Sequence, residues 1–174
     1  MAYCTQTLNG ITLDCTNNKG GIKTVYIANY DEISIEKTVD SNGIVTAITG
    51  ITGTFKPYQF RKNTGSMTST LTADESNGLN YVTTEVSLVF TRMDGDKRLE
   101  MSALSLGQLA VVVEDSNGSV WYLTVDDYAS ASAGGGETGT AKGDRNAYTL
   151  TLSVENDTYP VDITELWSDS FIAE

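Results

Sequence analysis

The chain has 174 residues, of which 40% are hydrophobic and 20% are charged. This balance is typical of a single folded domain with its own core, and it argues against a disordered chain. The 23 acidic residues outnumber the 11 basic ones and give a formal net charge of -12. A field of this sign repels nucleic acids and anionic lipids, so we expect neither to bind tightly.

The first ten positions, residues 1–10, carry no basic residue and no apolar run, unlike a secretory signal. No stretch approaches the roughly 20 apolar residues that a membrane-spanning helix needs. Unless a leader has been removed, we therefore expect a protein that is made in a cytosol and has no membrane partner.

Cysteine and histidine are scarce. Cys4 and Cys15 are the only cysteines, and histidine is absent. A disulfide between them would need the segment to be a hairpin, so we expect reduced, buried thiols instead. Without histidine the chain lacks the usual general base and the commonest metal ligand, and two cysteines complete a zinc site only with carboxylates. The sequence therefore predicts no metal and no cofactor.

In chain order, the first expected elements are strands over residues 23–28 and 44–48, with a helical turn over 29–33. A strand around Pro57 is placed at a sheet edge, because proline cannot donate to a ladder. Residues 61–80 are polar and rich in Thr and Ser, and they are predicted to form either a projecting hairpin arm or a disordered loop.

The next predicted elements are a strand over residues 80–92 and a helix over residues 95–107. Asp94 or Asp96 can accept an amide hydrogen bond at the start of the helix, and Gly107 is expected to end it in a left-handed conformation. Three apolar residues recur at helical spacing and predict its buried face: Leu99, Ala103 and Leu106.

The last third of the chain is predicted to be mostly strands. The apolar run 109–113 indicates a strand buried on both faces, paired as a hairpin with residues 120–125. Residues 148–155 alternate between apolar and polar side chains, as does a strand with one face in the core. Residues 129–143 are rich in Gly, Ala and Ser and are predicted to be a mobile loop. Three tight two-residue turns with positive φ at both centres are expected at Ser-Asn-Gly, at 41–43, 76–78 and 116–118.

No pattern points to catalysis. Three acidic doublets would be candidates for a carboxylate-dependent glycosidase, but nothing in their spacing singles out a catalytic pair: Asp31-Glu32, Asp74-Glu75 and Asp126-Asp127. The run 134–139 matches a dinucleotide fingerprint by letter, but the residues around it do not read as strand, turn and helix. The sequence is therefore interpreted as non-enzymatic.

From Tyr81 onward the features follow a recognisable order. A long strand ending at Arg92 leads through Asp96-Lys97-Arg98-Leu99 into the helix. Two strand segments and a late segment follow: Ala110-Val111-Val112-Val113-Glu114-Asp115-Ser116-Asn117-Gly118, Val120-Trp121-Tyr122-Leu123 and Thr138-Gly139-Thr140-Ala141-Lys142-Gly143-Asp144-Arg145-Asn146-Ala147-Tyr148. This order resembles virion structural proteins of phages that infect Bacteroides-type gut bacteria, including crAss-like phages. Their late segment reads like Thr-Gly-x-Ala-x-Gly-Asp-x-Asn-Gly-Tyr, and Ala147 replaces the last glycine here.

The resemblance covers about the second half of the chain. It implies a mainly β, tail-tube-like fold, a β-sandwich or partly closed barrel with one flanking α-helix and an extended arm or loop. It also implies a ring-forming tail or head–tail connector subunit in the virion, assembled in the cytoplasm of the host bacterium. The implied partners are copies of the chain and neighbouring tail or connector proteins. DNA would only pass through, along a lumen that part of the excess acid faces.

A ring subunit needs strand edges and a heterologous interface that closes. The arm and the Gly-rich loop would supply contacts to the next copy. The residues expected at this interface are Arg61, Lys62, Asn63, Thr64, Ser66, Met67, Gly134, Gly135, Gly136, Thr138 and Lys142. The alternative interpretation is a β-sandwich module that binds glycans, as in an adhesin, through six aromatic residues: Trp121, Tyr122, Tyr128, Tyr148, Tyr159 and Trp167.

Overall fold

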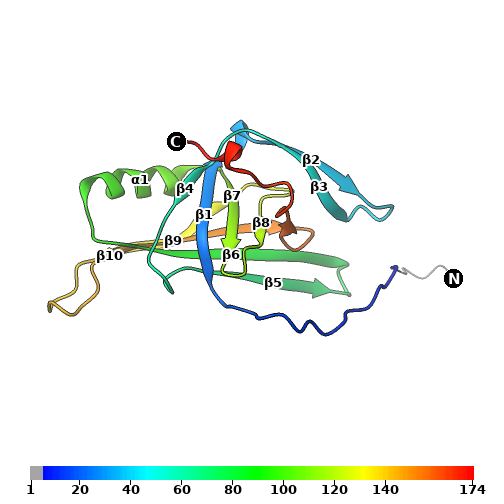
Figure 1. The fold of residues 1–174 in the computed structure, drawn as a ribbon, viewed down its shortest axis with the longest axis horizontal. Coiled ribbons are helices and arrows are strands. Elements are labelled where there is room, and N and C mark those ends of the chain that lie inside the picture. The colour runs from blue at the N-terminus through cyan, green and yellow to red at the C-terminus, as the bar shows by residue number, and fades with distance from the viewer. Residues whose placement is uncertain (1–5) are drawn as a thin grey trace.

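The computed structural model describes residues 6–174 and is mainly β, with three antiparallel sheets and one α-helix (Figure 1). The central sheet has the order β11–β8–β7–β1–β4, formed by Val161–Asp162, Val120–Tyr122, Leu109–Asp115, Ile22–Asn29 and Lys56–Tyr58. The four-stranded sheet has the order β5–β6–β10–β9, formed by Ser66–Asp74, Leu79–Thr91, Ala147–Asn156 and Ser130–Glu137. A separate ribbon pairs β2 (Ser34–Val39) with β3 (Val45–Thr52). In this part of the chain no sheet closes into a barrel.

The central sheet is apolar on both faces, as the run in β7 predicted. Leu109, Val111 and Val113 belong to the core shared with the four-stranded sheet. Ala110 and Val112 belong to a second core, shared with the ribbon and the C-terminal segment. Because all five side chains are buried, β7 reads as a continuous apolar run with no alternation.

Two edge and turn predictions near β1 are confirmed. Pro57 lies in β4 at the edge of the central sheet, opposite Tyr26. A short 3-10 helix, Tyr30–Glu32, follows β1 within the expected helical turn. A second one, Asp169–Phe171, lies near the C-terminus, and Phe55 bonds to its last residue through the Phe55 N–H and the Phe171 carbonyl at 2.7 Å.

The four-stranded sheet has one apolar and one polar face, and the alternation predicted for its two inner strands is confirmed. Leu150 lies opposite Leu88, and Leu152 lies opposite Val86, with all four side chains buried toward the central sheet. The residues between them point away from the core. This sheet therefore presents one polar face to the surroundings.

The helix, α1 (Gly95–Leu106), begins where predicted but packs differently. Asp94 caps it by accepting from the Lys97 N–H at 2.8 Å. Gly107 has φ -80°, so the expected left-handed end is wrong. Leu104 is buried, whereas Leu99 and Leu106 are 59% and 89% exposed. The expected buried face therefore points outward, because the helix packs against the core beside β9 and β10 with Leu104 and the half-buried Met101 instead.

Glycine supplies the only positive φ in each Ser-Asn-Gly turn, so the expected two-residue turns are wrong. Gly43, Gly78 and Gly118 have φ of 85°, 65° and 89°. The aspartate that begins each turn accepts backbone amides through its side chain, as when Asp115 Oδ1 bonds Asn117 N at 2.8 Å and Ser119 N at 3.0 Å. The carboxylate holds an ordinary turn, and glycine returns the chain to the next strand.

Residues 129–143 are not a loop throughout, because Ser130–Glu137 form β9. This strand pairs with β10, with one register shift at Ser132. Backbone hydrogen bonds to β10 therefore order a strand whose small side chains bury little apolar area. Only the residues between β9 and β10 form a loop. The mobile-loop prediction is therefore wrong for the glycine run itself.

Cys15 is exposed, which contradicts the expected buried thiol. It lies in an extended segment, residues 6–20, that has no helix or strand and stands clear of the core. Cys4 lies outside the described residues, so its predicted state is not addressed.

Candidate assembly surface

The first group of predicted interface residues lies in the turn before β5 and at its start. Asn63 has φ 63°, and the turn is closed by Thr64 N–H and Thr64 Oγ1, which donate to the Arg61 carbonyl at 3.2 and 2.6 Å. The Arg61 Nε donates to Thr91 Oγ1 at 3.3 Å and ties the turn to the end of β6. Lys62 is exposed in the same turn, and Ser66 and Met67 open β5.

The second group lies in β9 and in the loop that follows it. Gly134, Gly135 and Gly136 are paired strand residues, whereas Thr138 and Lys142 are exposed in the loop. Asp144 organises that loop by accepting from the Thr140 and Ala141 amides at 2.8 and 2.7 Å. An ion pair between Arg145 and Glu137 joins the two ends of the loop. These loop residues are therefore held by local bonds in a single subunit.

The structure brings both groups to the same end of the four-stranded sheet, but on opposite edges. β5 begins and β6 ends there. Ala147 at the start of β10 lies opposite Thr91 on one side and opposite Glu137 on the other, so β9 ends there as well. β5 is one outer strand of the sheet and β9 is the other. The predicted residues therefore form two separate surfaces, one on each edge.

Both edges carry unpaired backbone groups. β5 and β9 each pair with one strand only within residues 6–174, over all 9 residues of β5 and over 7 of the 8 residues of β9, where the register shifts at Ser132. Neither strand contains lysine, arginine or proline, the residues that usually keep an exposed edge from pairing with another chain. Edges of this kind are suited to pairing with a second chain.

The outward face of β6 and β10 is polar and acidic. Its residues are mostly threonine and serine, and Ser87 Oγ lies 3.3 Å from Thr151 Oγ1 across the two strands. Glu85 and Glu155 are its charged residues, and both are exposed. Because this face of the two strands holds no lysine or arginine, it presents negative potential.

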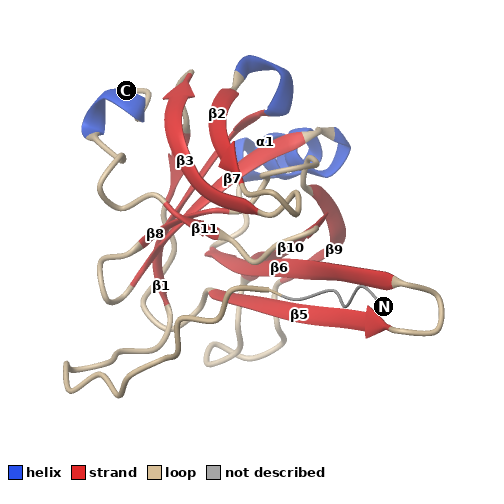
Figure 2. Cartoon of the chain, turned by 90° about the vertical axis from the view of Figure 1, so that its right-hand side faces the viewer, coloured by secondary structure: helices blue, strands red, loops and turns tan. Residues whose placement is uncertain are grey.

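The β5–β6 hairpin extends past the rest of the molecule (Figure 2). Residues 61–80 were predicted to form either a projecting hairpin arm or a disordered loop. They form the arm, because they contain β5 and the first residues of β6. Leu71 and Leu79 near its end are 48% and 52% exposed. The sequence analysis missed these apolar residues, because isolated leucines in a polar stretch give no periodic signal.

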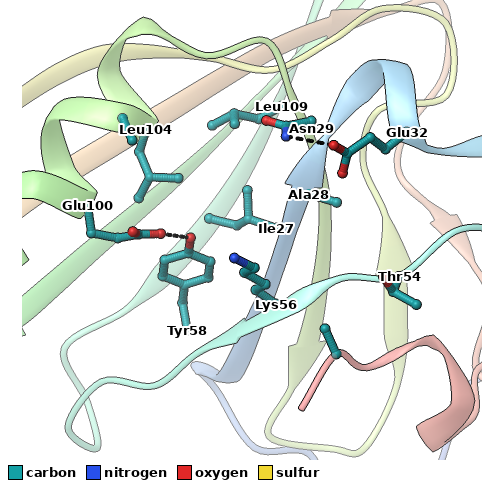
Figure 3. Close-up of a pocket in the computed structure, with 12 residues that line it drawn as sticks. Ile27, Ala28, Asn29, Glu32, Thr54, Lys56, Tyr58, Glu100, Leu104 and Leu109 are labelled. Carbon is teal, nitrogen blue, oxygen red and sulfur yellow. Dashed lines mark hydrogen bonds between the residues drawn. The ribbon is translucent and has the colours of Figure 1, made fainter.

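A cleft lies between α1, β1 and β4 (Figure 3). Tyr58 donates to Glu100 across it, and Asn29 Nδ2 donates to Glu32 Oε1 at 3.2 Å on its other side, with Lys56 in the same lining. Burial, together with the Glu100 carboxylate, raises the pKa of Tyr58. Tyr58 and Glu100 are thus bonded to each other across the cleft, and Asn29 and Glu32 are bonded to each other on one side of it.

The other candidate chemistry is scattered. The three acidic doublets lie on different turns, and Asp126 pairs with Lys37 at 2.9 Å. The glycines of the run 134–139 belong to a paired edge strand, with no helix following them. Among residues 6–174, no three His, Cys, Asp or Glu side chains gather where they could hold a metal ion.

The aromatic residues considered for glycan binding serve different packing roles. Tyr122 is buried, and Trp167 packs against Tyr26 and Phe55 with ring centroids 5.0 and 5.5 Å away. The Trp121 Nε1 donates to Asp115 Oδ2 at 3.0 Å across the β7–β8 turn. The six rings therefore do not share one exposed face.

No protein-family model, curated protein or solved structure that was compared with this chain matches it. Within the described residues, no helix has the length and apolar character to cross a membrane.

Proposed function

We propose that this protein is a non-enzymatic structural subunit of a bacteriophage virion, which forms rings in the tail or in the head–tail connector. The observation that carries the proposal is the pair of open edges, β5 and β9, on opposite sides of one sheet. A surface that binds a different surface on the next copy makes a heterologous contact, and repetition of that contact with a fixed rotation closes a ring. The family resemblance supplies the virion context and the tail-tube-like character of the fold.

The outward face of the four-stranded sheet supports a lumenal role. In a ring joined through the margins of this sheet, the Thr- and Ser-rich face with Glu85 and Glu155 would line one continuous wall. Short polar side chains with excess negative charge repel DNA phosphates at every point along that wall. DNA would pass through such a channel without being held.

Electron microscopy of the purified protein tests the assembly. We expect rings or short tubes in negative stain, and we expect peptides of this chain in purified phage particles by mass spectrometry. A protein that stays monomeric at high concentration and is absent from particles would remove the proposal. Micromolar binding to host polysaccharide, lost on substitution of Tyr159, would favour the glycan-binding alternative instead.

Edge variants test whether the two margins make the contacts. Thr70→Lys in β5 and Ala133→Lys in β9 each place a lysine on an open edge, where it opposes pairing with another strand. Thr46→Lys, on the exposed side of β3, changes the net charge by the same amount and is the matched control. We expect rings to be lost in both edge variants and kept in the control.

A further inference from the structure

The N-terminal segment, residues 6–20, presents three apolar side chains that are almost fully exposed in their own subunit. Leu8, Ile11 and Leu13 have exposed fractions of 89%, 102% and 91%. The segment is extended and pairs with no strand within residues 6–174. A described segment that leaves both its backbone groups and three large apolar side chains in water is suited to burial against another molecule.

A left-handed glycine in the segment would bring the three apolar side chains to one face once the segment pairs with a strand. In a regular strand Leu8 and Ile11 would point to opposite sides, because side chains alternate. Gly10 lies between them with φ 73°, the left-handed conformation that glycine adopts in a common type of β-bulge. Such a bulge makes two residues occupy the place of one. With Gly10 and Ile11 as the two bulged residues, Leu8, Ile11 and Leu13 share a face.

The base of the segment is fixed to its own subunit. Lys19 N–H donates to Asn117 Oδ1 at 2.8 Å, and Asn117 Nδ2 donates to Asn18 Oδ1 at 2.9 Å. These bonds hold the base beside the β7–β8 turn, and the blue trace in Figure 1 runs from there away from α1 and β9. Near its other end, Gln6 Oε1 accepts from Asn42 Nδ2 at 2.8 Å, so the segment runs from the β7–β8 turn to the β2–β3 turn of its own subunit. Its own helix lies toward the other end of the molecule (Figure 1), so the exposed apolar residues between these two points can reach a groove beside α1 only in another copy, after the Gln6–Asn42 bond is released.

An apolar groove with a free strand edge lies between α1 and β9. Its lining includes Met101 and Leu150, and its β9 side is built from Ala131, Gly134 and Gly136. The space beside Gly136 is filled by the Tyr148 ring and Met93. The open part of the groove therefore lies beside Ala131 and Gly134 of β9. The same strand has an edge with no partner in the described chain, so the groove offers both backbone hydrogen bonds and apolar contact.

We propose that the N-terminal segment of one copy adds as a strand to the free edge of β9 in a second copy, with Leu8, Ile11 and Leu13 in the α1–β9 groove. β9 has 8 residues, a length that residues 7–14 match. Strand addition would satisfy the backbone groups of both partners, and burial of the three side chains would supply the affinity. The inference rests on the proposed self-assembly and specifies its contact at β9: the strand that pairs with this edge is the N-terminal segment of the next copy, and the β5 edge makes a separate contact.

The β5 edge is the weaker acceptor for this segment. On its core side β5 presents Met67, Ser69 and Leu71, and α1 contacts β9 and β10 but makes no comparable contact with β5. A strand added there would find no groove for three large side chains. The β5–β6 hairpin remains open to a different contact with a neighbour.

Two complementary variants test the proposal in the full chain. The donor variant carries Leu8→Ser, Ile11→Ser and Leu13→Ser, and the acceptor variant carries Ser102→Glu and Ser105→Glu, two exposed helix positions that line the groove. By sedimentation velocity we expect each variant to associate at least about 100-fold more weakly than the wild type, because three apolar burials are lost or blocked. Thermal unfolding should be nearly unchanged, since the substituted side chains are exposed.

Mixing the two variants gives the sharper result. The acceptor variant keeps an intact N-terminal segment and the donor variant keeps an intact groove, so equal amounts should form one-to-one dimers that grow no further. Val39→Ser with Ile44→Ser removes exposed apolar residues from the ribbon and is the matched control, which should associate as the wild type does. A wild type that remains monomeric, or a donor variant that associates normally, would overturn the proposal.

The outcomes separate this inference from the proposed function. Rings that persist in the donor variant would remove the strand-addition contact and leave the virion role standing. Mixed dimers from a protein that forms no rings and is absent from phage particles would support the contact and remove the virion role.

Discussion

Tyr148 lies directly opposite Gly136 in the β9–β10 pair, and its ring occupies the space beside the glycine. A Cβ placed at position 136 would lie 3.0 Å from ring carbons of Tyr148 and 3.0 Å from Met93 Cε. An aromatic ring over a glycine on an edge strand compensates for the missing side chain. This contact explains how a strand of alanine, serine and glycine remains ordered on the sheet margin.

A bulkier residue at position 136 should disturb this contact. We expect Gly136→Val to lower the free energy of unfolding by about 1–3 kcal/mol, the usual cost of overpacking a filled site. The matched control is Gly135→Ala on the same strand, because its Cβ would meet only Thr149 Oγ1 at an ordinary 3.7 Å. Urea denaturation of both variants checks the difference. Equal stability of the two would show that the ring does not require a glycine opposite it.

Asn156 is a buried side chain that joins three backbone groups. Its Oδ1 accepts from Asp126 N and Asp127 N at 3.0 and 3.4 Å, and its Nδ2 donates to the Leu123 carbonyl. We expect Asn156→Ala to lower the free energy of unfolding by about 2 kcal/mol, because buried groups lose their partners. Asn80→Ala, at an exposed position of β6, is the control and should have little effect. A similar loss in both would assign the effect to the sheet rather than to this network.

The Asp94 cap makes part of the stability depend on pH. Hydrogen bonds from the Lys97 side chain and backbone N–H hold the pKa of Asp94 below its usual value. Because the folded-state pKa lies below the unfolded one, this contribution is present above the unfolded pKa and is lost as the pH falls through the folded pKa. Asp94→Ala should therefore be less stable than the wild type at neutral pH, and the gap should close as the pH falls from about 5 to about 2.

Denaturation midpoints across this pH range measure the effect. Asp96→Ala removes the same charge from the first turn of α1 without removing the cap, and it controls for net charge. A gap between Asp94→Ala and the wild type that stays constant down to about pH 2 would show that the carboxylate charge does not contribute.

The strands that bury one or both faces could be predicted from the sequence, because their burial leaves a local pattern. The run in β7 and the alternation in β10 each specify which faces are covered. β9 left no such pattern, because its order comes from a ladder with β10 and from one distant ring, Tyr148. Pairing with a strand further along the chain is invisible to local composition.

The helix shows the opposite difficulty. Leu99 and Leu106 follow the spacing of a buried face, but only tertiary packing decides which side of a helix meets the sheet. Here the side with Leu104 does, and the predicted stripe is left exposed. For the same reason, the interface residues predicted near 61–67 and 134–142 were found on two edges, since their relation depends on sheet order.

Association between copies should strengthen with salt. Each subunit carries a net charge of -12, so copies repel one another at low ionic strength. Screening shortens the range of this repulsion from about 14 Å near 50 mM salt to a few ångströms near 1 M, whereas strand pairing and apolar burial act only at contact. We expect the sedimentation coefficient at fixed concentration to rise across this range. A fall would mean that attractive ion pairs, rather than strand edges and apolar side chains, hold the copies together.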